Sequence, residues 1–253
     1  DTFFKFERYF IDTNADAVAI LMNGSYTESE NNVAVDRFQD VRIVGPEAKP
    51  VFPDSSQWKL TDVLNQLHFR SGKSGTYAIG ASIRPRVLEM TAEDFDSYLR
   101  HDGVLDVLYA RRAAGAPDGK IAEKYSKHVK ALFQVDDHRT DNVTKPFGYP
   151  IEIVPQTNPY TLTSGDELSV QVLFEGKPVG DQLVYASYAG YVGEREDDSA
   201  VDAVRTRTDE KGVARIPLTA NGDWYVHLIH MVPSLEPSVD YESNWATLTF
   251  AVE

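Results

Sequence analysis

The amino-acid sequence predicts a mostly β protein made of two β-sandwich domains, with a helical insert in or after the first. The last ~105 residues hold about seven short runs of strand-forming residues separated by turn residues, which is the spacing of a sandwich. The N-terminal part holds similar runs, followed by an amphipathic helical pattern. A length of 253 residues also fits two domains better than one. We therefore expect an N-terminal domain over 1–145 and a C-terminal domain over 146–253.

The first domain is expected to begin with strands. Its runs are rich in aromatic and β-branched side chains or alternate apolar with polar residues. Turn signals such as Asn23-Gly24 and Gly45-Pro46 end two of these runs. We expect strands at 3–11, 17–22, 38–44 and 76–87, whereas 58–69 fits either a strand or a short helix.

A helical insert is expected over about residues 91–128. Thr91 offers an N-cap oxygen, and acidic residues follow it in the first turn, as at the start of many helices. Phe95, Tyr98 and Leu99 then share one helix face. We expect a second helix over 104–114, and a segment that begins helical at 120 and becomes a strand by 129–135.

The second domain is expected to follow a polar linker. Residues 136–145 have the composition of an exposed connection, so the domain boundary is placed there. Beyond it, alternating runs and turn residues are typical of an immunoglobulin-like or transthyretin-like sandwich. The expected strands are 151–154, 167–174, 182–188, 203–208, 213–217, 224–231 and 244–252.

Composition excludes several classes of function. Acidic residues number 39 against 25 basic ones, and the net charge of −14 disfavours nucleic acid and anionic membranes while attracting cations. The absence of cysteine excludes disulfides, thiolate metal sites and cysteine nucleophiles. No apolar run approaches the ~20 residues of a membrane helix, so no membrane insertion is expected. The chain starts at Asp1 rather than Met, which fits a removed signal peptide or a trimmed start.

Several sequence strings carry a family resemblance when they are taken together. They are EKYSK at 123–127, GYPIEIVP at 148–155, NPY at 158–160, VQVLFEGKP at 170–178, TDEKG at 208–212, GDWYV at 222–226, IHM at 229–231 and NWATLTF at 244–250. In this order, over roughly 95–253, the set resembles the NikM-like family of exported bacterial proteins, which are described as nickel-uptake accessory proteins. The resemblance implies a periplasmic or secreted protein that handles nickel or a related metal, with an envelope protein or transporter as a second partner. Members typically begin with a His-Asp pair, so the resemblance implies a histidine directly before Asp1.

The candidate metal ligands are histidines and carboxylates, because the chain has no thiolate. His227 and His230 are the closest pair of histidines, but residues three apart on a strand point to opposite faces, so we treat them as separate candidates. His230 is preferred because the resemblance includes it, and Asp240 and Glu242 follow after a loop that can fold back. With Asp1, these residues form the candidate set for Ni²⁺, Co²⁺, Cu²⁺ or Zn²⁺. The alternative is a hydrogen-bonded strand histidine with solvated acids.

Other polar clusters give weaker indications. The segment 123–130 fits an anion-binding junction or an exposed face, and His101-Asp102-Gly103 fits the end of a helix. The loop acids Glu194, Glu196, Asp197 and Asp198 fit a weak Ca²⁺ site or a solvated loop.

No nucleophile elbow, phosphate-binding loop or zinc-protease motif occurs, so we expect a non-enzymatic protein. The leading interpretation is therefore an extracytoplasmic metal-binding or metal-uptake accessory protein. The main alternative is an adhesion or binding module for a protein or glycan, without metal, and a hydrolase is the third.

Overall fold

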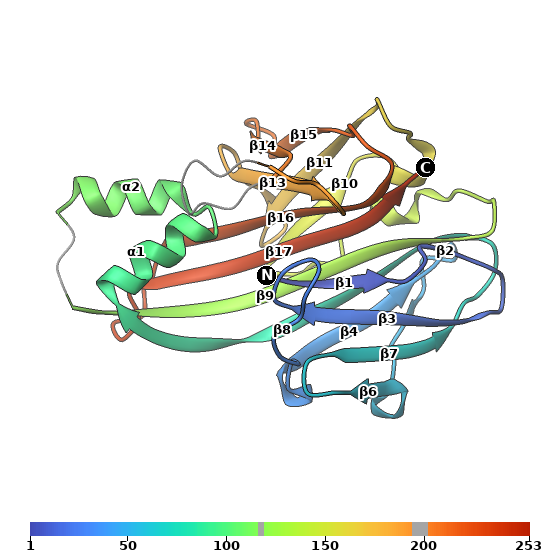
Figure 1. The fold of residues 1–253 in the computed structure, drawn as a ribbon, viewed down its shortest axis with the longest axis horizontal. Coiled ribbons are helices and arrows are strands. Elements are labelled where there is room, and N and C mark those ends of the chain that lie inside the picture. Colours follow the sequence, from blue (N-terminus) through green and yellow to red (C-terminus); the bar gives the residue numbers. More distant parts are fainter. Residues whose placement is uncertain (116–118, 194–201) are drawn as a thin grey trace.

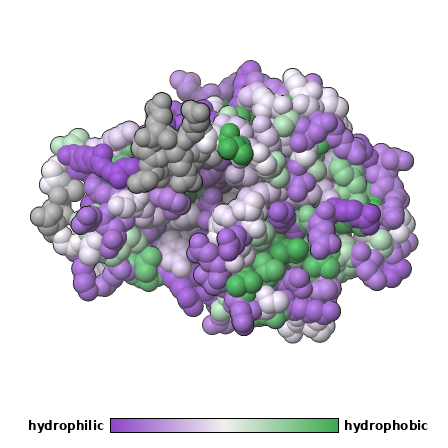
Figure 2. Space-filling view, viewed as in Figure 1, coloured by the Kyte–Doolittle hydropathy of each residue, from purple (hydrophilic) through white to green (hydrophobic). Residues whose placement is uncertain are grey.

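The computed structural model describes residues 1–115, 119–193 and 202–253, and these residues form a mostly β protein. Within them, strands assemble into one large sheet and two small ones, accompanied by two α-helices (Figure 1). Figure 2 shows that the face seen in this view is mostly hydrophilic, with a hydrophobic group over the region of β3 and β7. No helix among the described residues is long and apolar enough to cross a membrane.

The first small sheet comes from the N-terminal part of the chain, and its strand order is β1-β3-β7-β6. Its strands are antiparallel neighbours: β1 (Thr2–Phe6), β3 (Asp16–Asn23), β7 (Asn65–Arg70) and β6 (Trp58–Leu60). The sheet resolves the ambiguity at 58–69, which forms two strands. Alternate side chains such as Phe4, Phe6 and Leu67 point inward and are at most 2% exposed.

The large sheet combines strands from both halves of the chain, in the order β14-β13-β16-β17-β9-β8-β4-β5, with β2 beside β9. From the first half come β2 (Phe10–Ile11), β4 (Phe38–Val44), β5 (Pro50–Val51), β8 (Gly75–Thr91) and β9 (Lys120–Val135). From the second half come β13 (Leu183–Tyr188), β14 (Val204–Arg207), β16 (Gly222–Pro233) and β17 (Tyr241–Val252). The junction is a parallel pairing of β17 with β9. Strands on both sides of the predicted boundary thus share one sheet, and the division into two domains stays a prediction.

The second small sheet is C-terminal. It consists of β10 (Ile151–Pro155), β11 (Glu167–Phe174), β12 (Lys177–Pro178) and β15 (Val213–Pro217), with β11 paired to the other three. The strands predicted at 167–174 and 213–217 coincide with β11 and β15.

The two small sheets cover opposite faces of the large one. Phe133 of β9 packs against Phe6 and Phe69 of the first small sheet. Lys130, whose side chain points to the other face of β9, contacts Glu152 of β10. The core therefore runs through three layers, with β9 and β17 in the middle layer.

The helices α1 (Ala92–His101) and α2 (Leu105–Ala113) lie between β8 and β9 in the sequence. Phe95, Leu99 and Leu108 are at most 1% exposed and pack with Ile229 and Trp245 of the large sheet. Trp245 lies near Lys127, which bonds to Thr2 of β1, so the helices cover the same face as the first small sheet. The helices cover one end of this face of the large sheet and the first small sheet covers the other, as the left and right sides of Figure 1 show.

The interpretation of residues 120–130 as partly helical is wrong. The whole segment Lys120–Val135 is one strand, β9, and the helices end at Ala113 rather than near residue 128. Helix-forming residues such as Ala122, Glu123 and Lys124 favour a local helix, but β8 on one side and β17 on the other supply backbone partners. Tertiary pairing therefore decides the conformation.

The polar stretch at 136–145 is held by specific bonds rather than fully exposed. Thr140 N–H donates to Thr76 Oγ1 at 3.2 Å, and Asn142 Nδ2 donates to Thr76 O at 3.1 Å. Val143 is 2% exposed. Backbone and side-chain groups of this segment thus attach it to Thr76 of β8.

Replacing Thr91 with alanine is expected to lower the free energy of unfolding by about 1 kcal/mol, the typical cost of a lost N-cap. The Thr91 hydroxyl accepts from Asp94 N–H at 3.1 Å and donates to the Asp94 carboxylate at 2.7 Å. Urea unfolding measures the change, and Thr91→Ser, which keeps the hydroxyl, serves as the control. Equal losses in both variants would show that the cap does not stabilise α1.

Candidate functional site

A polar hollow on the helix-covered face lies between the end of α1 and the start of β1. Its volume is about 580 Å³. The floor comes from the large sheet through Lys127 of β9 and His227 of β16, and Asp1 stands on the β1 side. His101 and Asp102, at the end of α1, form the facing wall. We call this space the N-terminal hollow.

His227 is the most enclosed imidazole in the N-terminal hollow, at 6% exposed. Its Nδ1 lies 3.4 Å from Asp1 Oδ2, and its Nε2 lies 3.2 Å from Asp202 Oδ2. The ring also stacks on Tyr185, its cross-strand neighbour on β13, with 5.4 Å between the ring centroids. Both ring nitrogens therefore face a carboxylate, and the ring plane is fixed by packing.

Asp1 is held by the loop after β3. Its amino group donates to Gly24 O at 3.0 Å, and its carbonyl accepts from Gly24 N–H at 2.8 Å. Beside it, the rings of Phe3, Tyr26 and Tyr225 form an aromatic wall, with 4.6 Å between the centroids of the two tyrosines. These contacts fix the Asp1 carboxylate at the edge of the hollow.

Burial lowers the pKa of the lysine that lines the N-terminal hollow. Desolvation lowers the pKa of the Lys127 ammonium to about 8, while Asp102 opposes the shift. Lys127 Nζ donates to Thr2 Oγ1 at 3.0 Å and lies 4.7 Å from the Trp245 ring centroid. The Lys127 ammonium thus loses its proton more readily than an exposed one.

Carboxylates outnumber the cations around this space. Asp1, Glu30, Asp102 and Asp202 all line it, and His101 Nδ1 lies 3.1 Å from Asp102 Oδ1. An acidic space with two imidazoles attracts cations and offers the nitrogen and oxygen donors that borderline divalent metals prefer.

Comparison with known families assigns the chain to a group. The family described as "Domain of unknown function (DUF4198)" matches residues 12–232. The chain belongs to the DUF4198 family. That description names no function, so the resemblance to the NikM-like proteins stays a prediction. No curated protein matches this DUF4198 chain.

Three solved structures are distantly similar to the chain. The D0-D1 domain of Intimin is 12% identical over 99% of this chain and 97% of its own, with a TM-score of 0.21. A chimeric titin Z1Z2-Z1Z2 tandem functionalized with a GRGDS exogenous peptide from fibronectin is 11% identical over 97% of each chain, with a TM-score of 0.19. The Bacillus anthracis TIE protein is 9% identical over 100% of this chain and 56% of its own, with a TM-score of 0.18. TM-scores this low indicate neither a shared fold nor a shared function for the DUF4198 chain.

Among the predicted ligands, the structure brings His227 and Asp1 together and leaves the others elsewhere. His230 bonds to Gln182 Oε1 through Nδ1 at 2.9 Å, and burial lowers its pKa. Asp240 Oδ2 accepts from Ala122 N–H at 2.8 Å, and Glu242 Oε1 accepts from the Ser234 hydroxyl at 2.9 Å. As strand geometry predicts, His227 and His230 have different surroundings.

A metal centre is not preassembled in the described parts of this DUF4198 chain. Across 1–115, 119–193 and 202–253, no three or more His, Asp or Glu side chains are placed to hold one ion. The loop acids Glu194, Glu196, Asp197 and Asp198 lie outside the described residues. A metal site built from the described residues of the N-terminal hollow therefore requires side chains to reorient.

Sequence reasoning did not identify four lining residues as candidate ligands: Glu30, His101, Asp102 and Asp202. They are far from His227 in the sequence, and no spacing pattern relates them. The end of α1 was recognised, but only as a helix terminus. The one usable signal was the histidine itself, since an imidazole in an otherwise apolar strand needs polar partners.

Proposed function

We propose that this chain is a non-enzymatic, extracytoplasmic metal-binding or metal-uptake accessory protein that takes a divalent transition metal in the N-terminal hollow. The observation that carries the proposal is the position of His227 between the carboxylates of Asp1 and Asp202. The resemblance to the NikM-like family supports the same class of ligand. In this proposal, residues 1–145 and 146–253 act as two sandwich units joined through the large sheet.

One pair of donor atoms already has a separation that suits a small divalent ion, and the remaining donors would have to reorient. Two ligands of a tetrahedral ion at about 2.0–2.1 Å are about 3.4 Å apart. The separation of His227 Nδ1 and Asp1 Oδ2 is 3.4 Å. His101 and Asp102 on the facing wall offer further nitrogen and oxygen donors within the same hollow. Nickel, cobalt, copper and zinc all accept this ligand chemistry.

Calorimetric titration with Ni²⁺, Co²⁺, Cu²⁺ and Zn²⁺ tests the proposal. We expect at least one metal to bind more tightly than ~10 μM, about −7 kcal/mol. His227→Gln is expected to weaken that binding roughly tenfold or more, because it removes the central nitrogen donor. A chain extended by one histidine before Asp1 is expected to bind more tightly, since Asp1 already lines the hollow.

His230→Gln is the matched control, because it removes one partly buried imidazole that has different partners. Its affinity should equal that of the parent chain. A loss confined to His230→Gln would instead move the site to the surroundings of His230. If neither the parent chain nor the extended chain binds any of the four metals, metal handling is ruled out and the metal-free binding module becomes the leading alternative.

A further inference from the structure

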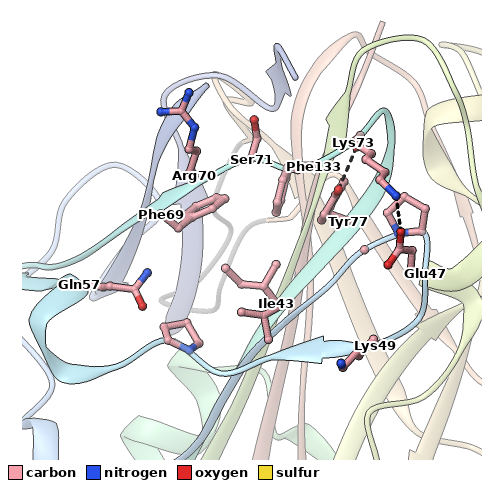
Figure 3. A pocket seen from close by; sticks show the side chains of 15 residues that line it. Ile43, Glu47, Lys49, Gln57, Phe69, Arg70, Ser71, Lys73, Tyr77 and Phe133 are labelled. Atoms are coloured by element: carbon pink, nitrogen blue, oxygen red, sulfur yellow. Dashed lines mark hydrogen bonds and ion pairs between the residues drawn. The ribbon is translucent and has the colours of Figure 1, made fainter. Parts of the chain in front are cut away.

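A second cavity lies where the first small sheet and the large sheet separate at one end. Its volume is about 350 Å³, and Figure 3 shows it from close by. Phe69 of β7, Ile43 of β4, Tyr77 of β8 and Phe133 of β9 all line it. We call it the inter-sheet cleft. It shares no lining residue with the N-terminal hollow.

The floor of the inter-sheet cleft is apolar and rigid. The Phe133 ring centroid lies 5.4 Å from that of Phe69 and 5.1 Å from that of Tyr77. Tyr77 is held from the far side as well, because its hydroxyl donates to Lys73 O at 2.9 Å. A Cβ on Gly45 would lie 2.3 Å from the Tyr77 ring, so the turn packs directly against it. Such a preformed apolar floor is typical of small-molecule sites, whose volumes are about 300–1,000 Å³.

The neutral polar groups at the edge of the cleft already have partners within the chain. Gln57 Oε1 accepts from Asp54 N–H at 3.0 Å, and Gln57 Nε2 donates to His68 O at 3.1 Å. The Ser71 hydroxyl donates to Asp12 O at 2.6 Å and accepts from Ala15 N–H at 2.9 Å. Recognition of a polar ligand group therefore falls to the charged side chains.

The charged rim of the cleft is basic. Lys49 and Lys73 line it together with Glu47, which gives two cations to one carboxylate, whereas the guanidinium of the lining residue Arg70 points away from the cavity (Figure 3) and lies 3.5 Å from the Asp16 carboxylate. Lys73 Nζ lies 2.7 Å from Glu47 Oε1, and both side chains are well exposed (Figure 3). In a chain with a net charge of −14, this local excess of positive charge is the reverse of the overall balance.

We propose that the inter-sheet cleft binds a small organic anion with an apolar, preferably aromatic, body. The apolar part lies against Phe69, Tyr77 and Phe133, where its burial is favourable. The acidic group lies at the mouth, where Lys49 and Lys73 attract it. This binding is independent of the metal proposed for the N-terminal hollow.

The probe 8-anilinonaphthalene-1-sulfonate, an aromatic body with one sulfonate, tests the inference with the whole folded chain. We expect one probe per chain, with NMR shift changes concentrated at Phe69, Tyr77 and Phe133. The neutral analogue N-phenyl-1-naphthylamine should bind at least about fivefold more weakly, because it lacks the ion pairs. Equal affinity for the two probes, or shift changes centred elsewhere, would overturn the inference.

Two kinds of variant locate the binding. Lys49→Gln with Lys73→Gln should weaken sulfonate binding about fivefold, whereas Lys59→Gln with Lys177→Gln should leave it unchanged. The Lys59→Gln, Lys177→Gln variant changes the net charge by the same amount as the first variant, but at exposed positions outside the cleft. Ile43→Trp should abolish binding of both probes by filling the cavity. Equal effects of the two lysine pairs would refute the proposed role of the rim, even if Ile43→Trp fails to fold.

Discussion

Replacing Lys130 with methionine is expected to lower the free energy of unfolding by about 3–5 kcal/mol, the usual cost of breaking a buried ion pair from one side. Lys130 Nζ lies 2.8 Å from Glu152 Oε1, and the two side chains are 4% and 2% exposed. Methionine keeps the apolar stem but removes the charge. The Glu152 carboxylate is then left in the core without a counter-ion. Urea unfolding at neutral pH measures the loss.

The expected loss is large because this ion pair joins two layers. Lys130 belongs to β9 in the large sheet and Glu152 to β10 in the second small sheet. Glu152 also accepts the backbone N–H groups of Phe147 and Gly148 at 2.6 and 2.9 Å, which fixes the segment before β10. Desolvation lowers the pKa of Lys130, and attraction to Glu152 opposes that shift. The charges stabilise the chain only as a pair.

A double variant separates the pair from the packing. Lys130→Met with Glu152→Gln removes both charges and keeps one oxygen for a backbone N–H, so it should recover more than half of the lost stability. Lys73→Met, which breaks the exposed pair with Glu47, should have a much smaller effect. If the double variant is no more stable than Lys130→Met, the loss arises from packing rather than from an unpaired carboxylate.

Sequence patterns predict the strands whose signals are local. The predictions at 38–44, 167–174 and 213–217 coincide with β4, β11 and β15, because alternation and adjacent turn residues define each one. Thr91 likewise marks the start of α1, because its hydroxyl and Asp94 lie within one turn. In these elements, local preference and the final fold agree.

The strand β9 could not be predicted in the same way. Its polar residues look solvated in the sequence, yet Glu123, His128 and Lys130 are 2%, 4% and 3% exposed. Glu123 accepts from the Ser243 hydroxyl, 120 positions away, and Lys130 pairs with Glu152. A local pattern cannot show that a buried charge has a distant partner, so the segment resembles a helix with an exposed face.

The N-terminal hollow was only partly predictable for the same reason. Asp1 and His227 were both candidates, but nothing in their spacing places the start of β1 beside β16. Asp202 reaches His227 Nε2 from the segment before β14, and His101 and Asp102 reach the same space from α1. Residue chemistry therefore indicated the type of donor, whereas three-dimensional packing selected which donors meet.

Acidification below about pH 6.5 is expected to destabilise the chain through His128, by about 2 kcal/mol between about pH 7 and about pH 4.5. The imidazole is 4% exposed, and desolvation lowers its pKa to about 4 from the usual 6.5. Hydrogen bonding with Asn244 and the charge of Glu152 oppose this shift. Between the two pKa values the unfolded state binds the extra proton. The contribution of His128 to the free energy of unfolding is therefore fully present above about pH 6.5 and is lost as the pH falls towards 4.

His128→Gln distinguishes this effect from the titration of carboxylates in the same range. Ser82 Oγ lies 3.0 Å from His128 Nδ1 and Ser126 Oγ lies 3.1 Å from Nε2, and an amide can satisfy at least one of these hydroxyls. The variant is expected to be less stable at neutral pH but to lose about 2 kcal/mol less on acidification, because it has no imidazole to protonate. Urea midpoints of both proteins across this range give the difference. Parallel pH profiles would show that His128 does not supply the acid sensitivity, and that the carboxylates alone account for it.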